Sequence, residues 1–176
     1  MKFAETSLAG AYVLDVERIS DERGFFARSF CRNELESHGL DPNVVQCNVS
    51  FNRKAGTLRG MHFQVAPHEE AKLVRCTMGA VHDVIVDLRP GSPTFRRSYA
   101  VELSAQNRRA LFVPKGFAHG FQTLSDDTEV LYQMSVFHHP ESARGLRFDD
   151  PALGIAWPLP PSIMSERDRS YPLLPA

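Results

Sequence analysis

The 176-residue chain has few cysteines and no long apolar run. Its three cysteines, Cys31, Cys47 and Cys76, are odd in number and show no C-x-x-C spacing. We therefore interpret them as reduced thiols and not as a disulfide framework. No stretch approaches the roughly 18 apolar residues of a membrane-spanning helix, and "MKFAETSLAG" at the start has no signal-peptide core. These absences predict a cytoplasmic protein that has no membrane partner.

Lysine is also scarce. The 20 basic residues are 16 arginines and only 4 lysines, and the formal net charge is −1. This balance gives no general reason to expect a nucleic acid partner. Arginine, however, suits bidentate recognition of carboxylate or phosphate, so a small anionic ligand is a candidate. The alternative is that these arginines are solvated surface groups.

Several signatures of catalytic and cofactor sites are absent. No G-x-S-x-G occurs, the cysteines lack a Cys-His-Asn signature, and "GTLRG" at 56–60 fits no phosphate-binding loop. The segment "PKGFAHGF" at 114–121 resembles a second cupin motif, in which the histidine is a metal ligand. In "HFQVAPHEE", however, Gln64 stands where the first cupin motif supplies its second histidine. Because a stable metal site takes three or four ligands, we expect neither a metal nor a cofactor.

What the sequence does contain is a series of short alternating segments separated by turn residues. They are 11–18, 44–51, 57–64, 71–79, 80–90, 97–104, 109–114, 117–125 and 128–137. This pattern is typical of an all-β sandwich or barrel, and the number of antiparallel strands favours a jelly roll. We expect one jelly-roll β-barrel domain over residues 1–176.

Three further elements are expected. A short helix runs from about Asn33 to His38 and is stopped by Gly39. Residues 78–80, Met-Gly-Ala, join two strands as a hairpin. The tail after Asp149 holds half of the 12 prolines, so we expect it to be irregular and packed around Trp157.

Polar side chains gather on one face of five predicted strands, because successive side chains of a strand alternate between its faces. That face carries Gln46, Asn48, Ser50, His62, Gln64, Lys72, His119 and Tyr132. If it lines the interior, these groups must be hydrogen-bonded, solvated or covered by a ligand. The alternative is that the faces point outward to water. Arg59 has the opposite parity from His62, so both reach one site only if Gly60 introduces a bulge.

This set of groups suits proton abstraction next to a carbonyl. A histidine can take a carbon-bound proton, and Lys72 or a second histidine can stabilise the enolate oxygen. Tyr132 can return a proton. Return from the opposite side inverts the carbon, which is epimerisation and requires no cofactor. A carboxylate is still needed to orient the base.

The chain resembles the dTDP-4-dehydrorhamnose 3,5-epimerase family in a set of ordered motifs. They are "DERGFF" (21–26), "QCNVS" (46–50), "LRGMHFQ" (58–64), "KLVRC" (72–76), "SPTF" (92–95), "PKGFAHGF" (114–121), "LYQ" (131–133), "GIAWP" (154–158) and "SERD" (165–168). Together they cover almost the whole chain. The resemblance implies a jelly-roll homodimer in which N-terminal segments are exchanged between subunits.

The resemblance also implies roles for residues. His62 is the expected base, paired with Asp168, and Tyr132 is the expected acid. Lys72 and His119 are expected near the 4-keto oxygen of a nucleotide-linked 4-keto-6-deoxy sugar, most simply a dTDP-linked one.

A second group of residues is expected to bind the substrate. Arg59, with Gln46 and Asn48, holds the diphosphate and the sugar. Arg23 and Phe25 reach the nucleotide, which is bound by the neighbouring subunit.

Two places depart from the family pattern. Arg28 stands where the family commonly has an acidic residue near the nucleobase, and Phe137-His138 stand where the family commonly has an aromatic tyrosine pair. The first bears on the choice of nucleobase and the second on whether C3, C5 or both are inverted. A mono-epimerase and a keto-sugar isomerase acting on another nucleotide sugar are therefore alternatives. A non-catalytic sugar-binding cupin and a metal-dependent cupin dioxygenase are alternatives from other functional classes.

Overall fold

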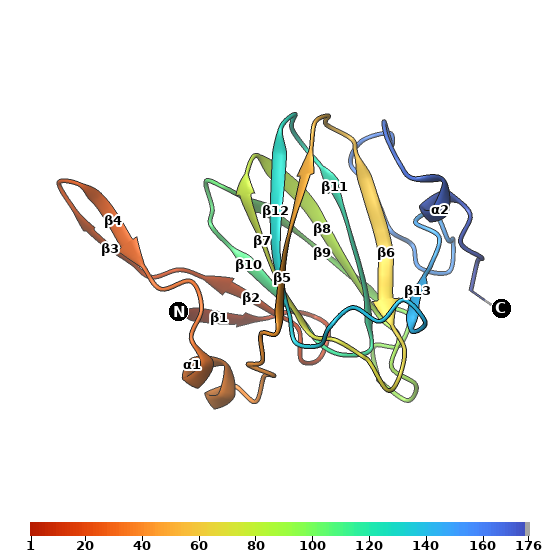
Figure 1. Ribbon diagram of the computed structural model, residues 1–176, viewed down its shortest axis with the longest axis horizontal. Coiled ribbons are helices and arrows are strands. Elements are labelled where there is room, and N and C mark those ends of the chain that lie inside the picture. Colours follow the sequence, from red (N-terminus) through yellow and green to blue (C-terminus); the bar gives the residue numbers. More distant parts are fainter. Residues whose placement is uncertain (175–176) are drawn as a thin grey trace.

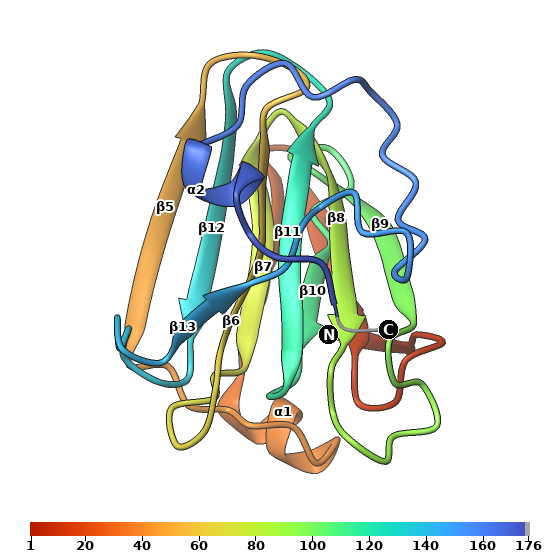
Figure 2. The same ribbon diagram turned by 90° about the vertical axis from the view of Figure 1, so that its right-hand side faces the viewer.

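The computed structural model describes residues 1–174 and contains two antiparallel sheets packed face to face (Figures 1 and 2). One six-stranded sheet has the order β1 (Lys2–Glu5), β2 (Tyr12–Asp15), β10 (Ala110–Val113), β7 (Lys72–Met78), β12 (Thr128–Met134), β5 (Gln46–Asn52). The five-stranded sheet has the order β13 (Ala143–Gly145), β6 (Leu58–Gln64), β11 (Phe117–Thr123), β8 (Ala80–Asp87), β9 (Ser98–Ser104). The predicted all-β jelly roll is confirmed.

The remaining elements lie outside these two sheets. A separate hairpin, β3 (Arg18–Asp21) and β4 (Gly24–Ala27), extends away from the body of the protein (Figure 1). Helix α1 (Arg32–Ser37) ends as predicted, because Gly39 follows its C-cap with a φ of 70°. Helix α2 (Glu166–Arg169) lies in the C-terminal tail. Within residues 1–174, no helix is long and apolar enough to cross a membrane.

Each of the nine predicted segments contains a strand, but four strands were not predicted. These are β1, β3, β4 and β13, each of only three or four residues. In β1, β3 and β4 most side chains are exposed on both faces. Such strands show no apolar alternation, so the sequence carries no periodic signal for them. The last two residues of the predicted domain lie outside the described part of the chain.

The predicted hairpin at residues 78–80 is wrong. β7 belongs to the six-stranded sheet and β8 to the five-stranded sheet, so the chain crosses from one sheet to the other at Gly79. Gly79 has a φ of 74°, and an added Cβ would lie 2.4 Å from the Thr128 hydroxyl. Glycine is therefore required by a tight corner between sheets, which local sequence does not distinguish from a hairpin turn.

The core between the sheets follows the predicted alternation. In β7, Val74 and Cys76 pack inside, whereas Leu73 packs on the outer face against α1. The inner cluster includes Val81, Ile85, Leu103, Leu111, Phe117, Phe121 and Val130, each no more than 4% exposed. Lys72 has the same parity as Val74, so its side chain also points between the sheets.

The C-terminal tail packs over the surface around Trp157, as predicted, and the face that it covers is the outer face of the five-stranded sheet (Figure 2). Trp157 packs against the cluster formed by Met61, Val84 and Leu153, and its indole N–H donates to the Phe148 carbonyl oxygen at 2.8 Å. The tail is irregular except for α2, which has Ser165 as its N-cap. This path brings α2 next to β6.

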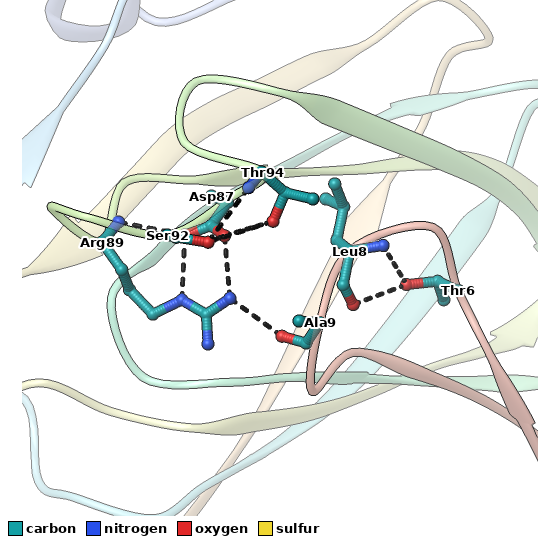
Figure 3. Close-up of polar contacts among 7 residues, drawn as sticks. All are labelled: Thr6, Leu8, Ala9, Asp87, Arg89, Ser92 and Thr94. Carbon is teal, nitrogen blue, oxygen red and sulfur yellow. Dashed lines mark hydrogen bonds and ion pairs between the residues drawn. The ribbon is translucent and has the colours of Figure 1, made fainter.

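A buried polar network fixes the loop that contains the "SPTF" motif (Figure 3). Both oxygens of Asp87 accept hydrogen bonds from Arg89, and Oδ2 also accepts from the Ser92 and Thr94 hydroxyls. Burial opposes ionisation of Asp87, but these hydrogen bonds outweigh it and hold the pKa of the carboxyl far below its ordinary value. Arg89 also donates to the Ala9 carbonyl oxygen at 2.9 Å. The motif therefore has a structural role, which is to join this loop to the N-terminal segment.

Candidate active site

A cavity of about 770 Å³ opens between the two sheets. Its walls come from β5, β7 and β12 on one side and from β6 and β11 on the other, with α2 at the margin. The predicted site residues that line it are Gln46, Asn48, Arg59, His62, Lys72, His119, Tyr132, His138 and Asp168. The polar faces identified by period-two counting therefore point inward.

Arg59 and His62 both line the cavity because β6 contains a bulge at Gly60. His62 pairs with His119 on β11, but Arg59 pairs with Phe121, so β6 has one extra residue over this interval. Gly60 has a φ of 130° and lies so close to β11 that an added Cβ would be 2.5 Å from the Gly120 Cα. The bulge reverses the parity of the strand, and the predicted explanation for Arg59 is confirmed.

His62 is held by a carboxylate from the distant tail. Its Nε2–H donates to Asp168 Oδ1 at 2.7 Å, and Asp168 Oδ2 accepts from the Gly60 N–H at 3.2 Å. Burial opposes ionisation of Asp168, but the hydrogen bond and charge of His62 outweigh it, so the pKa of this carboxyl lies below its ordinary value. Because the carboxylate only accepts, it fixes the proton on Nε2 and leaves Nδ1 as the basic nitrogen.

A second histidine–aspartate pair lies beside the first. His119 Nε2 is 3.0 Å from both oxygens of Asp83 on β8. Sequence reasoning missed Asp83, although a signal was present, because Asp83 lies between Val81 and Ile85 on the inward face of β8. An inward carboxylate in such a strand requires a partner.

Lys72 is bound to a glutamate that sequence reasoning also missed. Lys72 Nζ lies 3.0 Å from Glu70 Oε1, and the two side chains are only 8% and 5% exposed. The same Nζ donates to the His62 carbonyl oxygen at 3.3 Å. Glu70 stands in "HEEAK", which reads as a solvated connection, so no local signal separates it from Glu69. The amine is thus fixed beside His62.

Tyr132 lies on β12, in the sheet opposite His62, and lines the same cavity. Burial raises the pKa of its phenol, whereas the charge of Arg59 acts in the opposite direction. The phenol therefore stays protonated at neutral pH and can donate a proton. An imidazole and a phenol thus reach the cavity from opposite walls.

Hydrogen bonds also order the side of the cavity that contains Arg59. Arg59 Nε donates to Asn52 Oδ1 at 2.7 Å, and Asn52 is in turn held by the Ser50 and Thr128 carbonyl oxygens. Gln46 Nε2 donates to Asn48 Oδ1 at 3.1 Å. A guanidinium oriented through Nε suits recognition of phosphate oxygens.

Four predicted substrate-binding residues lie outside this cavity. Arg23 pairs with Asp21 at the tip of the β3–β4 hairpin, and Phe25 lies between the Arg18 and Arg108 guanidinium groups. Arg28 pairs with Glu34 of α1 at 2.7 Å, and Phe137 is 59% exposed.

Comparison with known proteins identifies the class of enzyme. A family model described as dTDP-4-dehydrorhamnose 3,5-epimerase matches residues 5–176. The enzyme of that name from Sinorhizobium fredii is 43% identical, covering 99% of this chain and 90% of the relative. The crystal structure of the Bacillus anthracis epimerase with TDP and PPi bound is 44% identical, with a TM-score of 0.94 over 98% of this chain and 99% of that one.

A Legionella pneumophila RmlC structure in complex with dTDP-4-keto-L-rhamnose is also similar. It is 38% identical, with a TM-score of 0.91 over 98% of this chain and 92% of that one. The fold and the cavity are thus those of a sugar-nucleotide isomerase. The chain belongs to the dTDP-4-dehydrorhamnose 3,5-epimerase family.

Proposed function

We propose that this isomerase inverts C3 and C5 of a dTDP-linked 4-keto-6-deoxyhexose. One observation carries the proposal: His62, oriented by Asp168, and Tyr132 belong to opposite sheets and line one cavity. Removal of a proton by one wall and its return by the other inverts a carbon. The dTDP-4-keto-L-rhamnose bound to the Legionella relative supports this substrate class.

The chemistry follows from the 4-keto group, which acidifies the protons on both neighbouring carbons. His62 Nδ1 takes the proton from C3 or C5, and the electron pair moves to the keto oxygen as an enolate. Lys72, with His119 nearby, stabilises the negative charge on that oxygen. Tyr132 then gives its proton to the opposite face of the carbon, and the phenolate and His62 are reset by exchange with solvent.

Substrate binding is assigned to the polar end of the cavity. Arg59 binds the diphosphate through its terminal N–H groups, because Nε is occupied by Asn52. Gln46, Asn48 and His138 contact the sugar. The TDP and PPi bound to the Bacillus anthracis relative support a diphosphate subsite.

The active form is a homodimer of single-domain subunits in which the β3–β4 hairpin is exchanged. An isolated two-stranded hairpin is marginal in water, yet this one extends from the body with Ile19 70% and Phe26 71% exposed (Figure 1). On the partner, the hairpin delivers Arg23 and Phe25 to the nucleotide, and Arg28, directly after β4, lies near the nucleobase. The three free cysteines agree with a cytoplasmic location.

The test is incubation with dTDP-, CDP- and GDP-4-keto-6-deoxyglucose in heavy water, followed by proton NMR. We expect deuterium at C3 and C5 of the dTDP sugar and an inverted product. Label at one carbon alone would establish a mono-epimerase. Movement of the keto group away from C4 would establish a keto-isomerase. Faster exchange of the CDP or GDP sugar than of the dTDP sugar would show that the enzyme prefers another nucleobase, in line with the departure at Arg28. If no candidate sugar exchanges, the proposal is wrong.

A further inference from the structure

Three potential metal ligands meet at the rim of the cavity, outside the residues that line it. His68 lies in the connection between β6 and β7, and His139 and Glu141 lie between β12 and β13. The two imidazole rings are stacked, with centroids 3.5 Å apart and planes within 8° of parallel. His139 Nδ1 is 3.1 Å from Glu141 Oε1, and one ligand atom from each residue falls within 4.8 Å of the others. We call these three residues the rim cluster.

The backbones that hold the rim cluster are cross-linked by one buried side chain. Gln64, which is 5% exposed, accepts from the His139 N–H at 2.6 Å and donates to the His68 carbonyl oxygen at 2.9 Å. Its Nε2 also lies 3.3 Å from the Phe137 carbonyl oxygen. Gln64 therefore fixes the two loops relative to each other before any ligand binds, which reduces the entropic cost of binding.

The chemistry of the cluster favours a cation. Imidazole nitrogen is the commonest metal ligand in proteins, and the cluster offers two imidazoles whose ligand atoms lie within reach of each other. Glu141 adds a carboxylate, a ligand type that divalent transition metals accept beside imidazole. All three side chains are partly exposed, at 31%, 34% and 67%, which gives an ion access from solvent.

We propose that the rim cluster binds one divalent transition metal ion, with Zn²⁺ as the best-suited species. Two imidazoles and a carboxylate with an open position for water form a set that Zn²⁺ accepts. Bonds of about 2.0–2.1 Å at tetrahedral angles put ligand atoms roughly 3.4 Å apart. The cluster reaches that spacing when the parallel rings open toward the ion by side-chain rotation, while Gln64 keeps the backbones in place.

A bound ion would tie the 65–71 connection to the 135–142 connection. His138 and Ala143, on either side of His139 and Glu141, line the cavity. The ion would therefore stiffen the rim of the active site without touching its base or acid. This inference is independent of the proposed epimerase activity.

The test is calorimetric titration of ZnCl₂ into the full chain without an affinity tag, with CoCl₂ titrated separately and followed by visible absorption. We expect one ion per chain at about pH 7.5 and an intense tetrahedral Co²⁺ band. His68→Ala, His139→Ala and Glu141→Gln should each weaken Zn²⁺ binding at least 10-fold. Zn²⁺ should raise the Tm of the wild type and not that of His68→Ala/His139→Ala.

Two controls locate the ion. His38→Ala removes an exposed histidine elsewhere on the surface, and His62→Asn removes an imidazole of the cavity. Both variants should bind Zn²⁺ as the wild type does. Unchanged binding by the double rim variant, loss of binding in His62→Asn, or no binding by the wild type at millimolar Zn²⁺ would each overturn the proposal.

Discussion

Two histidine–aspartate pairs stand side by side in the cavity, and they are built differently. His62 and His119 are direct cross-strand partners on β6 and β11. The first is paired with Asp168 from the tail, and its side chain is 43% exposed. The second is paired with Asp83 from the next strand, and its side chain is only 9% exposed. The same two residue types thus occupy an open and a closed setting.

Because of this difference, the two pairs suit different roles in the proposed reaction. An exposed imidazole with one ring nitrogen fixed by a carboxylate can meet a substrate carbon and release its proton to solvent. A closed imidazole, held by both oxygens of a fully buried carboxylate, is suited to a fixed polar contact with the keto oxygen. The proposed base thus differs from the neighbouring histidine in its burial and in the element that supplies its carboxylate, and not in residue type.

The largest expected effect tests that assignment directly. His62→Asn should lower turnover by at least the roughly 10²–10⁴-fold typical of a lost general base, and deuterium exchange at both carbons should fall with it. His119→Asn should lose less and should still exchange. NMR in heavy water measures both, with circular dichroism to check the fold and His38→Asn as a surface control. A larger loss in His119→Asn would reverse the two roles.

The second prediction exchanges the carboxylates for amides. In Asp168→Asn a single oxygen replaces two acceptors, so His62 Nε2 or the Gly60 N–H loses its partner, and an amide N–H turned toward Nε2 would move the imidazole proton to Nδ1. We expect a turnover loss on the order of 10²-fold or more with little change in substrate affinity. Asp83→Asn keeps an acceptor for His119 and should lose less than 10-fold.

The same variant has a consequence for acid stability. The folded pKa of Asp168 is lowered, so its contribution to stability is present above the unfolded pKa of about 4 and is lost as pH falls through the folded pKa. The difference in unfolding free energy between wild type and Asp168→Asn should therefore shrink below about pH 4. A constant difference down to low pH, measured by urea unfolding, would contradict the assigned hydrogen bond between His62 and the Asp168 carboxylate.

The His62–Asp168 pair also shows which part of the site local sequence does not predict. Alternation along β5, β6, β7, β11 and β12 predicted the inward polar faces, because a strand repeats every two residues. By that rule alone, Arg59 and His62 would lie on opposite faces of β6. The close approach of Gly60 to Gly120 explains the bulge that brings both to the cavity. Asp168 was assigned through family resemblance, since a contact across 106 residues leaves no periodic signal.

Other features were not predicted from the sequence, for related reasons. The β3–β4 hairpin has exposed side chains on both faces, so hydrophobic periodicity is absent where folding does not require it. Glu70 lies in a polar connection, and its side chain is buried in an ion pair with Lys72. Local sequence identified the strands, whereas the partners of the buried charges depended on three-dimensional packing.

The third prediction concerns the wall opposite His62. Tyr132→Phe keeps the ring and removes only the proton donor, so His62 should still exchange the substrate's α-protons while the carbon is rarely inverted. The ratio of exchange to inversion, measured by NMR at C3 and C5 separately, should rise by at least about 10-fold. Inversion at the wild-type rate would exclude Tyr132 as the acid and would leave both protonation steps to the His62 side of the cavity.

The smallest expected effect separates the base from the cation beside it. Glu70→Gln keeps the size of the side chain and an acceptor for Lys72, but it removes the charge that balances a nearly buried ammonium. Glu70 Oε2 has no hydrogen-bond partner among the described residues, so the change acts chiefly through Lys72. The amine loses the charge-assisted hydrogen bond that holds it in place, so it should be positioned less well for the enolate, and we expect kcat to fall by about 10-fold, which corresponds to about 1.4 kcal/mol.

Glu69→Gln is the matched control for that change, because it removes one negative charge from the adjacent position, where no ion pair with Lys72 is formed. Its kcat should stay at the wild-type value. KM and calorimetric affinity for dTDP should be unchanged in both variants, since the carboxylate of Glu70 contacts Lys72 and not Arg59. A selective loss of kcat would make Glu70 a positioning residue for the oxyanion. If dTDP affinity fell instead, the buried pair would belong to the anion-binding side of the cavity, and the enolate would depend on the His119–Asp83 pair alone.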